Sequence, residues 1–293
     1  MRRTASRRRH ACVAVAVACI ATSPLAYGQI GPAAPDTARH QSLFTTADPW
    51  IMSAFVAGTA AMMPLDRTIA RELQEPETQT SRVAKRSAQL FNTIGDPGTL
   101  VIGVGMYGVG RLAHLDRVAD LGLHGTEAII VSGGITAALK AVAGRERPNF
   151  AGVLDPGDFR VGRGLSGDYA SFPSGHTTAA FAAATVVTAE TSRWWPHSTW
   201  FVAPIMYAGA SVVGMARLYS NAHWSSDVVL GAGIGTLTGL KVFRFNHTHA
   251  GNRLDRWLLG AAPAVSPGSA LAAGGSSGAR LTWSIATDFG HPR

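Results

Sequence analysis

The chain has 293 residues, of which 46% are hydrophobic and 15% are charged. It is therefore long enough for one ordinary domain with appendages, and apolar enough to bury a large core or to enter a membrane. Its formal net charge of +8 depends on five arginines near the N-terminus, without which 21 Lys and Arg remain against 18 Asp and Glu. Because no basic stripe remains, this composition argues against a nucleic-acid-binding protein.

The first 28 residues are typical of an export signal. Arginines at positions 2, 3, 7, 8 and 9 precede an apolar stretch at about 11–21, and small residues before Gln29 suit cleavage there. This predicts a signal peptide over residues 1–28 and a location in the bacterial periplasm. An uncleaved anchor helix is the alternative, although the stretch is short for a membrane span. Both cysteines, Cys12 and Cys19, lie in this segment, so the mature chain has no disulfide framework.

The polar residues 29–48 are expected to form a linker. Six segments rich in Ala, Gly, Val and Leu follow, each too long for an ordinary strand, and they predict helices. We therefore expect an all-α protein, a compact helical bundle of about six core helices. The expected helices cover Pro49–Leu65, Gly98–Leu115, Glu127–Val142, Thr177–Thr191, Thr199–Leu218 and Asp227–Phe243.

The last residues, 250–293, differ from the bundle in composition. Ala261–Gly278 is rich in Ala, Gly, Ser and Pro and is expected to be flexible. Leu281, Trp283 and Ile285 alternate with other residues, which is consistent with a short strand. The sequence thus predicts a flexible tail that contains at most one strand.

A first candidate motif is Lys140-x6-Arg147-Pro148, at the end of the third expected helix. Proline stops the helix and holds Arg147 in an extended segment. A lysine point charge and an arginine fork can together hold several oxygens of a tetrahedral anion. On its own this pair is weak evidence, because basic residues at a helix C-terminus commonly satisfy the last carbonyls.

A second motif, Pro-Ser-Gly-His over residues 173–176, opens the fourth expected helix. Gly175 allows a ligand to approach the backbone closely, and the free N–H groups of a first helical turn suit an anion. His176 lies on the same turn. A capping turn with an incidental histidine is the alternative for this motif alone.

A third motif, Arg217-x5-His223-x3-Asp227, joins the fifth and sixth expected helices. His223 and Asp227 are four residues apart, so at a helix start they share a face. A carboxylate there can accept a hydrogen bond from one imidazole nitrogen and leave the other nitrogen free to attack. A surface His–Asp pair with an unrelated arginine is the alternative.

In this order and spacing, the three motifs resemble those of the type 2 phosphatidic acid phosphatase and vanadium haloperoxidase superfamily. The resemblance covers roughly residues 49–243 and departs from many relatives at Ala216, where they have a serine. It implies a helical phosphatase domain over residues 49–249 with the active site at one end of the bundle. It also implies a hydrolase without metal or cofactor that acts on phosphate monoesters or diphosphate esters through a phosphohistidine.

The same resemblance assigns roles to the site residues. His223 would attack phosphorus, Asp227 would orient it, and His176 would protonate the leaving oxygen and then activate water. The phosphate oxygens would be held by Lys140, Arg147, Arg217 and the backbone N–H groups of Ser174 and Gly175.

Two other functions are compatible with parts of this pattern. A vanadium-dependent haloperoxidase would use the same pocket, but the six-residue gap between Lys140 and Arg147 fits the phosphatases. A non-catalytic exported membrane protein should have gaps among the site residues, and there are none.

His247-x-His249 resembles a metal pair, but it follows the last expected helix without a third ligand, so we expect no metal site. Arg145 and Arg160 are expected to be solvated loop residues.

The substrate can be a lipid phosphate or a small soluble ester. The first, second and sixth apolar segments contain only about 13–17 uncharged residues, fewer than the ~20 of a span, and only the region Trp194–Ala216 is comfortably long. With a cleaved leader, six spans would also place the loop after the third helix in the cytoplasm. These points favour a periplasmic domain that is soluble or peripherally attached to the membrane. The sequence makes no prediction of oligomeric state.

Overall fold

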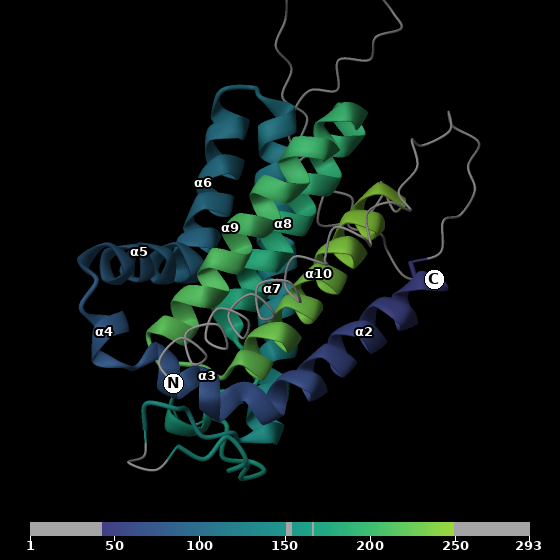
Figure 1. The fold of residues 1–293 in the computed structure, drawn as a ribbon. Coiled ribbons are helices and arrows are strands. Elements are labelled where there is room, and N and C mark those ends of the chain that lie inside the picture. The colour runs from purple at the N-terminus through teal and green to yellow at the C-terminus, as the bar shows by residue number, and fades with distance from the viewer. Residues whose placement is uncertain (1–42, 151–153, 166, 249–293) are drawn as a thin grey trace, which may run out of the picture. The chain divides into compact units, whose positions relative to one another are not determined.

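The computed structural model describes residues 43–150, 154–165 and 167–248. The predicted signal peptide, most of the linker and the tail lie outside the described residues. Within them the regular elements are helical, apart from one isolated antiparallel bridge between Arg145 and Phe159, so the all-α prediction is confirmed. The α-helices (Figure 1) are α2 (Ala47–Met62), α3 (Asp66–Leu73), α4 (Pro76–Gln79), α5 (Arg82–Thr93), α6 (Thr99–Leu112), α7 (Asp116–Ala143), α8 (Gly175–Trp194), α9 (Thr199–Tyr219) and α10 (Ser225–Thr248).

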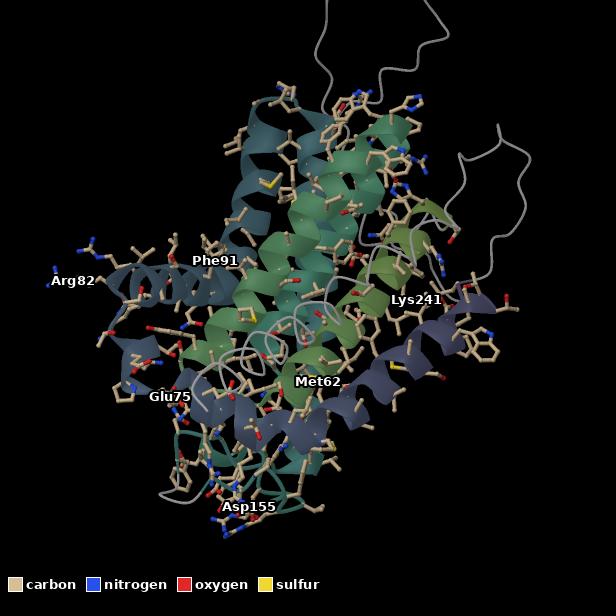
Figure 2. The ribbon with its side chains drawn as sticks, viewed as in Figure 1. Met62, Glu75, Arg82, Phe91, Asp155 and Lys241 are labelled. Carbon is tan, nitrogen blue, oxygen red and sulfur yellow. The ribbon has the colours of Figure 1, made fainter. Side chains whose placement is uncertain are left out.

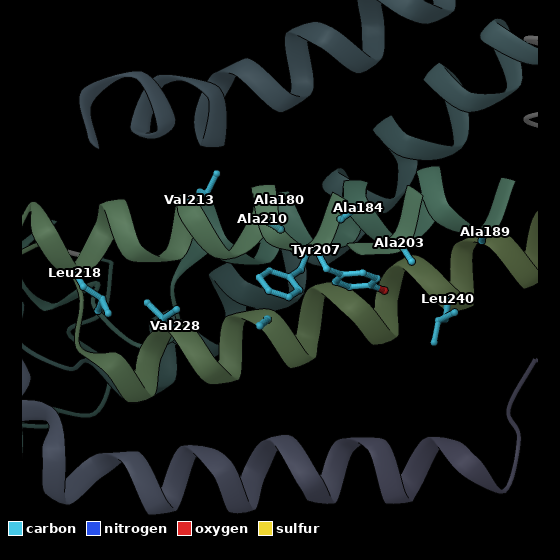
Figure 3. Packing of buried hydrophobic residues seen from close by; sticks show 12 residues of the cluster. Ala180, Ala184, Ala189, Ala203, Tyr207, Ala210, Val213, Leu218, Val228 and Leu240 are labelled. Atoms are coloured by element: carbon cyan, nitrogen blue, oxygen red, sulfur yellow. The ribbon is translucent and has the colours of Figure 1, made fainter. Parts of the chain in front are cut away.

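The core lies among the long helices, where α8 packs against α7, α9 and α10. α2 lies along α10, and α6 lies along α7. Small side chains fill much of the largest apolar cluster, and Figure 3 shows Ala184 and Ala203 on neighbouring helices close to Tyr207. The Tyr207 ring packs against Phe181 with centroids 5.8 Å apart, and its hydroxyl meets the Thr185 hydroxyl at 2.9 Å. Small residues therefore let these helices approach closely around a few aromatic rings.

Glycines four residues apart on α10 allow its contact with α8. A Cβ added at Gly235 would lie 2.3 Å from the Thr178 carbonyl oxygen, and one at Gly231 would lie 2.7 Å from the Ser174 carbonyl oxygen. Gly239 is similarly close to Thr185. This spacing of small residues lets two helix backbones approach each other. It brings the first turn of α8 against the first turn of α10, where two of the three motifs lie.

The six expected core helices are present, but their ends differ from the apolar segments. α7 begins at Asp116 and not at Glu127, and α10 continues to Thr248 beyond Phe243. Charged residues such as Asp120 interrupt the apolar pattern without interrupting the helix. Acidic groups in a first turn interact favourably with the helix dipole, which explains why α7 starts before its apolar part.

Three helices between residues 66 and 93 lie outside the six segments that predict helices. Here α3 and α5 are amphipathic and polar, and α5 is capped by Ser81, whose hydroxyl accepts a hydrogen bond from the Ala84 N–H at 3.2 Å. Figure 2 labels Arg82 and Phe91 near the two ends of α5. The Phe91 side chain packs against the largest apolar cluster. A π-helical turn, Ile94–Gly98, then leads into α6.

In the part of the chain that the structure describes, three segments are long and apolar enough to cross a membrane: α7, α10, and α9 with the short helix that precedes it, over Pro196–Tyr219. The expectation that only the fifth apolar region is long enough is therefore wrong, because α7 and α10 extend beyond their uncharged runs. Large apolar side chains are also exposed on two of these helices. They are Ile130, Val131, Ile135 and Leu139 on α7, and Trp200, Phe201, Ile205 and Val212 on α9.

Candidate active site

All three motifs lie at one end of the bundle. Lys140 is in the last turn of α7 and Arg217 in the last turn of α9, while Gly175 begins α8 and Asp227 is in the first turn of α10. Figure 2 shows Asp155, in the loop between α7 and α8, beyond these helix ends. The four long helices therefore place residues that are far apart in sequence around one site.

His223 lies between α9 and α10 and is 3% exposed. Its Nδ1 atom is 2.8 Å from the carbonyl oxygen of Ser171 and 3.6 Å from the Asp227 Oδ2 atom. A carbonyl oxygen only accepts, so Nδ1 carries the proton and Nε2 has its lone pair available. From the sequence we expected Asp227 to fix the tautomer of His223. The backbone carbonyl of Ser171 fixes it, and the Asp227 carboxylate lies close to the ring.

Burial lowers the pKa of the His223 imidazole from its ordinary 6.5 to about 3, and the positive charges of Lys140 and Arg147 act in the same direction. Asp227 opposes these effects by stabilising the charged ring. Since the folded pKa lies below the ordinary value, the ring of the free protein is neutral at every pH well above about 3. A neutral imidazole is the form that can act as a nucleophile.

Because its pKa is lowered, the His223 imidazole is expected not to gain a proton in mildly acidic solution. In ¹⁵N-histidine spectra of the full-length protein in detergent micelles, the His223 signals should remain those of a neutral Nδ1–H ring between pH 7 and pH 5. Spectra of the His223→Gln variant assign the signals by difference. Protonation of His223 near pH 6.5 would contradict the buried, desolvated environment described above.

Asp227 is fully buried and accepts hydrogen bonds from three groups. Its Oδ1 atom accepts from Arg145 Nη1 at 2.5 Å. Its Oδ2 atom accepts from the Ser171 hydroxyl at 2.5 Å and from the Trp224 N–H at 2.9 Å. Fixed in this way, the carboxylate cannot rotate away, and it can stabilise positive charge that develops on the His223 ring.

Arg145 is not the solvated loop residue that we expected, because it is only 1% exposed. Its Nη1 atom donates to Ser226 Oγ at 2.7 Å and to Asp227, while Nη2 donates to Asp66 Oδ2 at 2.8 Å and to the Pro156 carbonyl at 2.7 Å. Nε donates to the same carbonyl at 2.9 Å. All five N–H donors of the guanidinium are therefore occupied, and Arg145 serves to position Asp227.

Asp66 completes this buried group from the start of α3. It accepts hydrogen bonds from the Ser225 hydroxyl at 2.5 Å and from the Ser226 N–H at 2.9 Å, at the first turn of α10. No sequence pattern distinguishes Asp66, because an aspartate after Pro64-Leu65 is typical of any helix start. By contrast Arg160 is exposed and pairs with Asp158 at 3.0 Å, as a solvated loop residue does.

Lys140 and Arg147 are half-buried, and their charges act on His223. The charge of a third half-buried cation, Arg217, acts on Lys140. The Lys140 ammonium donates to the Ala170 carbonyl at 2.5 Å, and Arg147 Nε donates to the Gly167 carbonyl at 2.7 Å. Arg147 Nη1 reaches the carbonyl of Ala222 at 3.4 Å, directly before His223. These carbonyls hold the cations beside the imidazole, where their remaining donors can bind phosphate oxygens.

Arg217, the third cation, is positioned by a residue that the motifs do not contain. Its Nη1 atom donates to Asn92 Oδ1 at 3.1 Å, and the Asn92 amide donates to the Ser220 hydroxyl at 2.8 Å. Asn92 lies in the last turn of α5, so the polar segment between the first two apolar helices contributes to the site. No sequence pattern indicated this contribution.

The Pro-Ser-Gly-His segment forms the start of α8 as expected, with one difference. The Ser174 N–H donates to the Asp227 carbonyl at 3.0 Å, so it is engaged within the protein and does not face an anion. Gly175 is the first helical residue, and the position of its missing Cβ is 3.9 Å from Lys140 Cε. The Ser174 N–H is therefore not available for the predicted contact to phosphate, whereas the contact from the Gly175 N–H stays a prediction. His176 packs against the π-helical turn at Gly95.

Residues 123–250 match the model of the PAP2 superfamily. This segment of the chain is similar to the PAP2 superfamily. The resemblance inferred from the three motifs is thereby confirmed, and every predicted site residue lies within the matched range.

Known proteins are similar to parts of this chain. A lipid A 1-phosphatase of Porphyromonas gingivalis is 39% identical over 92 residues, which cover 30% of this chain and 19% of that relative. The crystal structure of a transmembrane PAP2-type phosphatidylglycerolphosphate phosphatase from Bacillus subtilis is similar with a TM-score of 0.50 and 22% identity, over 70% of this chain and 98% of that chain. LpxE of Aquifex aeolicus gives a TM-score of 0.43 and 21% identity, over 61% and 94%. The Bacillus structure supports the helical fold.

Proposed function

We propose that this protein is a membrane-embedded phosphatase that removes phosphate from a lipid through a phosphohistidine on His223. The observation that carries the proposal is the buried, neutral His223, whose Nδ1–H donates to the Ser171 carbonyl and which lies within reach of the charges of Lys140 and Arg147. A neutral imidazole with a fixed tautomer is a nucleophile, and the cations stabilise the anionic group that it attacks.

The proposed reaction has two steps. Nε2 of His223 attacks phosphorus, the bond between phosphorus and the leaving oxygen breaks, and protonated His176 gives its proton to that oxygen. Water then attacks the phosphohistidine, neutral His176 accepts the proton of the water, and the P–N bond breaks with its electron pair returning to Nε2. Lys140, Arg147 and Arg217 neutralise the phosphate oxygens throughout, so that the proposed chemistry requires no metal ion.

The arrangement of the helices supports a membrane location. α7 and α9 both end at the site and both expose large apolar side chains, which in water would form an unfavourable surface. If these two helices cross a membrane, α8, which connects them, has to cross it in the opposite direction. Its 20 residues are about 30 Å long, which is sufficient for the hydrocarbon layer. α8 can be less apolar because neighbouring helices surround it.

A site at the end of membrane helices favours an amphiphilic substrate. A phosphate group at the membrane surface reaches the cations while its acyl or prenyl chains remain in the lipid. The names of the relatives, a lipid A 1-phosphatase and a phosphatidylglycerolphosphate phosphatase, support a lipid phosphate as the substrate class. We therefore favour a membrane-embedded enzyme over the soluble or peripheral domain expected from the sequence. The periplasmic location stays a prediction.

A panel of substrates tests this proposal. Purified full-length protein in detergent micelles should release phosphate from at least one of lipid A, phosphatidylglycerol phosphate, phosphatidate and a polyprenyl diphosphate. Because binding of the apolar chains contributes to transition-state stabilisation, kcat/KM for the best lipid should exceed that for p-nitrophenyl phosphate by about 100-fold. Vanadate should inhibit, and EDTA should leave kcat unchanged. A preference for the soluble ester would contradict the lipid part of the proposal, and no turnover of any of them would contradict the phosphatase itself.

A further inference from the structure

Three side chains from three helices meet at the end of the bundle opposite the phosphate site. His124 is in the N-terminal half of α7, Glu190 is near the end of α8, and His247 is in the last turn of α10. Lys140 follows His124 by 16 residues on α7. At 1.5 Å per residue, this group therefore lies about 24 Å along the helix from the phosphate site.

One carboxylate oxygen joins the two histidines. His124 Nδ1 is 2.6 Å from Glu190 Oε1, and His247 Nε2 is 2.8 Å from the same oxygen. One ligand atom from each residue lies within 4.8 Å of the others. The second oxygen, Glu190 Oε2, is fully buried and has no hydrogen-bond partner among the described residues. A buried carboxylate oxygen that lacks a donor is unfavourable, which suggests that a cation completes the group.

We infer that His124, Glu190 and His247 bind one divalent transition-metal ion of the zinc class. Two imidazole nitrogens and a carboxylate are ligands that zinc prefers, and water can supply a fourth. Around tetrahedral zinc, neighbouring ligand atoms lie about 3.3 Å apart. The histidine nitrogens would therefore move away from the carboxylate by roughly 0.5–0.7 Å, and each ring would carry its proton on the other nitrogen.

The surroundings suit a cation that is bound from solvent. Asp120 lies one turn before His124 on α7 and is close enough for its charge to act on all three groups. Carboxylates beside metal-bound histidines commonly orient them. The His247 side chain is 21% exposed, which gives an ion access to an otherwise buried site.

The sequence offered only part of this site. His247-x-His249 had no third ligand nearby, and we expected His247 to follow the last helix. α10 instead includes His247, and folding brings it to Glu190, which is 57 residues away in sequence. His124 is 66 residues from Glu190. The ion would join α7, α8 and α10, and at this distance from His223 it would contribute to stability and not to phosphate chemistry.

Metal content and thermal stability test the inference. Tag-free full-length protein, treated with EDTA and then dialysed against micromolar zinc, should retain about one zinc per chain by mass spectrometry. Addition of zinc to the metal-free protein should raise Tm by about 5 °C or more, while kcat on the preferred substrate stays constant. Cobalt substitution should give the visible absorption of a tetrahedral nitrogen and oxygen site.

Variants separate this site from adventitious binding. Glu190→Gln and His247→Asn should each abolish stoichiometric zinc and the rise in Tm, whereas the control His197→Ala, an exposed histidine at the same end of the bundle, should retain both. His247→Asn changes a partly exposed residue and remains measurable if Glu190→Gln does not fold. Equal zinc binding by wild type and His247→Asn, or no zinc in the wild type, would overturn the inference. Neither result would affect the proposed phosphatase, which requires no metal.

Discussion

Replacing His223 with alanine is expected to lower phosphate release by on the order of 10⁴-fold, because it removes the atom that attacks phosphorus. KM should change little, since Lys140, Arg147 and Arg217 still hold the phosphate oxygens. Phosphate release from the preferred lipid under single-turnover conditions measures the effect. Turnover close to that of the wild type would exclude His223 as the nucleophile.

The covalent intermediate makes this test more specific. After mixing with ³²P-labelled substrate and rapid quenching at alkaline pH, the wild type should carry label on a histidine, and His223→Ala should carry none. His176→Ala should accumulate label when the leaving group is a good one, because it lacks the base that activates water. His197→Ala is the matched control and should behave like the wild type, as an exposed histidine remote from the phosphate site. Label in His223→Ala would place the intermediate on another residue.

The three motifs identified residues that the fold brings to one end of the bundle, because the geometry that each motif sets is local. A helix start with Gly175, a proline after Arg147 and a four-residue spacing from His223 to Asp227 each set geometry over a few residues. The six core helices were predictable for a similar reason, since each has a continuous apolar run. The ends of α7 were less predictable, because charged residues such as Asp120 continue the helix after the apolar pattern stops.

The residues that position the site depend on contacts distant in sequence. Arg145 meets Asp66 across 79 residues and Asp227 across 82 residues. Nothing near Arg145 distinguishes it from Arg147, two positions later, although one faces inward and the other borders the phosphate site. Asn92 reaches Arg217 across 125 residues from a polar helix with no apolar run. Such contacts are decided by tertiary packing, which cannot be read from local patterns in a single sequence.

The Arg145 side chain should be the most sensitive single position for stability. Arg145→Met would leave the carboxylates of Asp66 and Asp227 buried without their counter-charge, which typically destabilises a protein by about 3–5 kcal/mol. The free energy of unfolding of Arg145→Lys should lie between those of Arg145→Met and the wild type. An ammonium keeps the positive charge but lacks the forked guanidinium that hydrogen-bonds to two carboxylates at once. Reversible unfolding in mixed detergent micelles measures the free energy of unfolding.

Kinetics separate the positioning role of Arg145 from its effect on folding. In Arg145→Lys protein that remains folded, kcat should fall more than KM rises, because Asp227 loses its fixed orientation beside His223 while the phosphate-binding cations are unchanged. Arg160→Met is the matched control: the exposed Arg160 side chain pairs with Asp158 in its own loop and lies over the Tyr169 ring, so stability and kcat should both stay close to those of the wild type. If Arg145→Met unfolds at the same free energy as the wild type, the two carboxylates do not depend on this guanidinium, and the buried Asp66–Arg145–Asp227 group does not hold the site together.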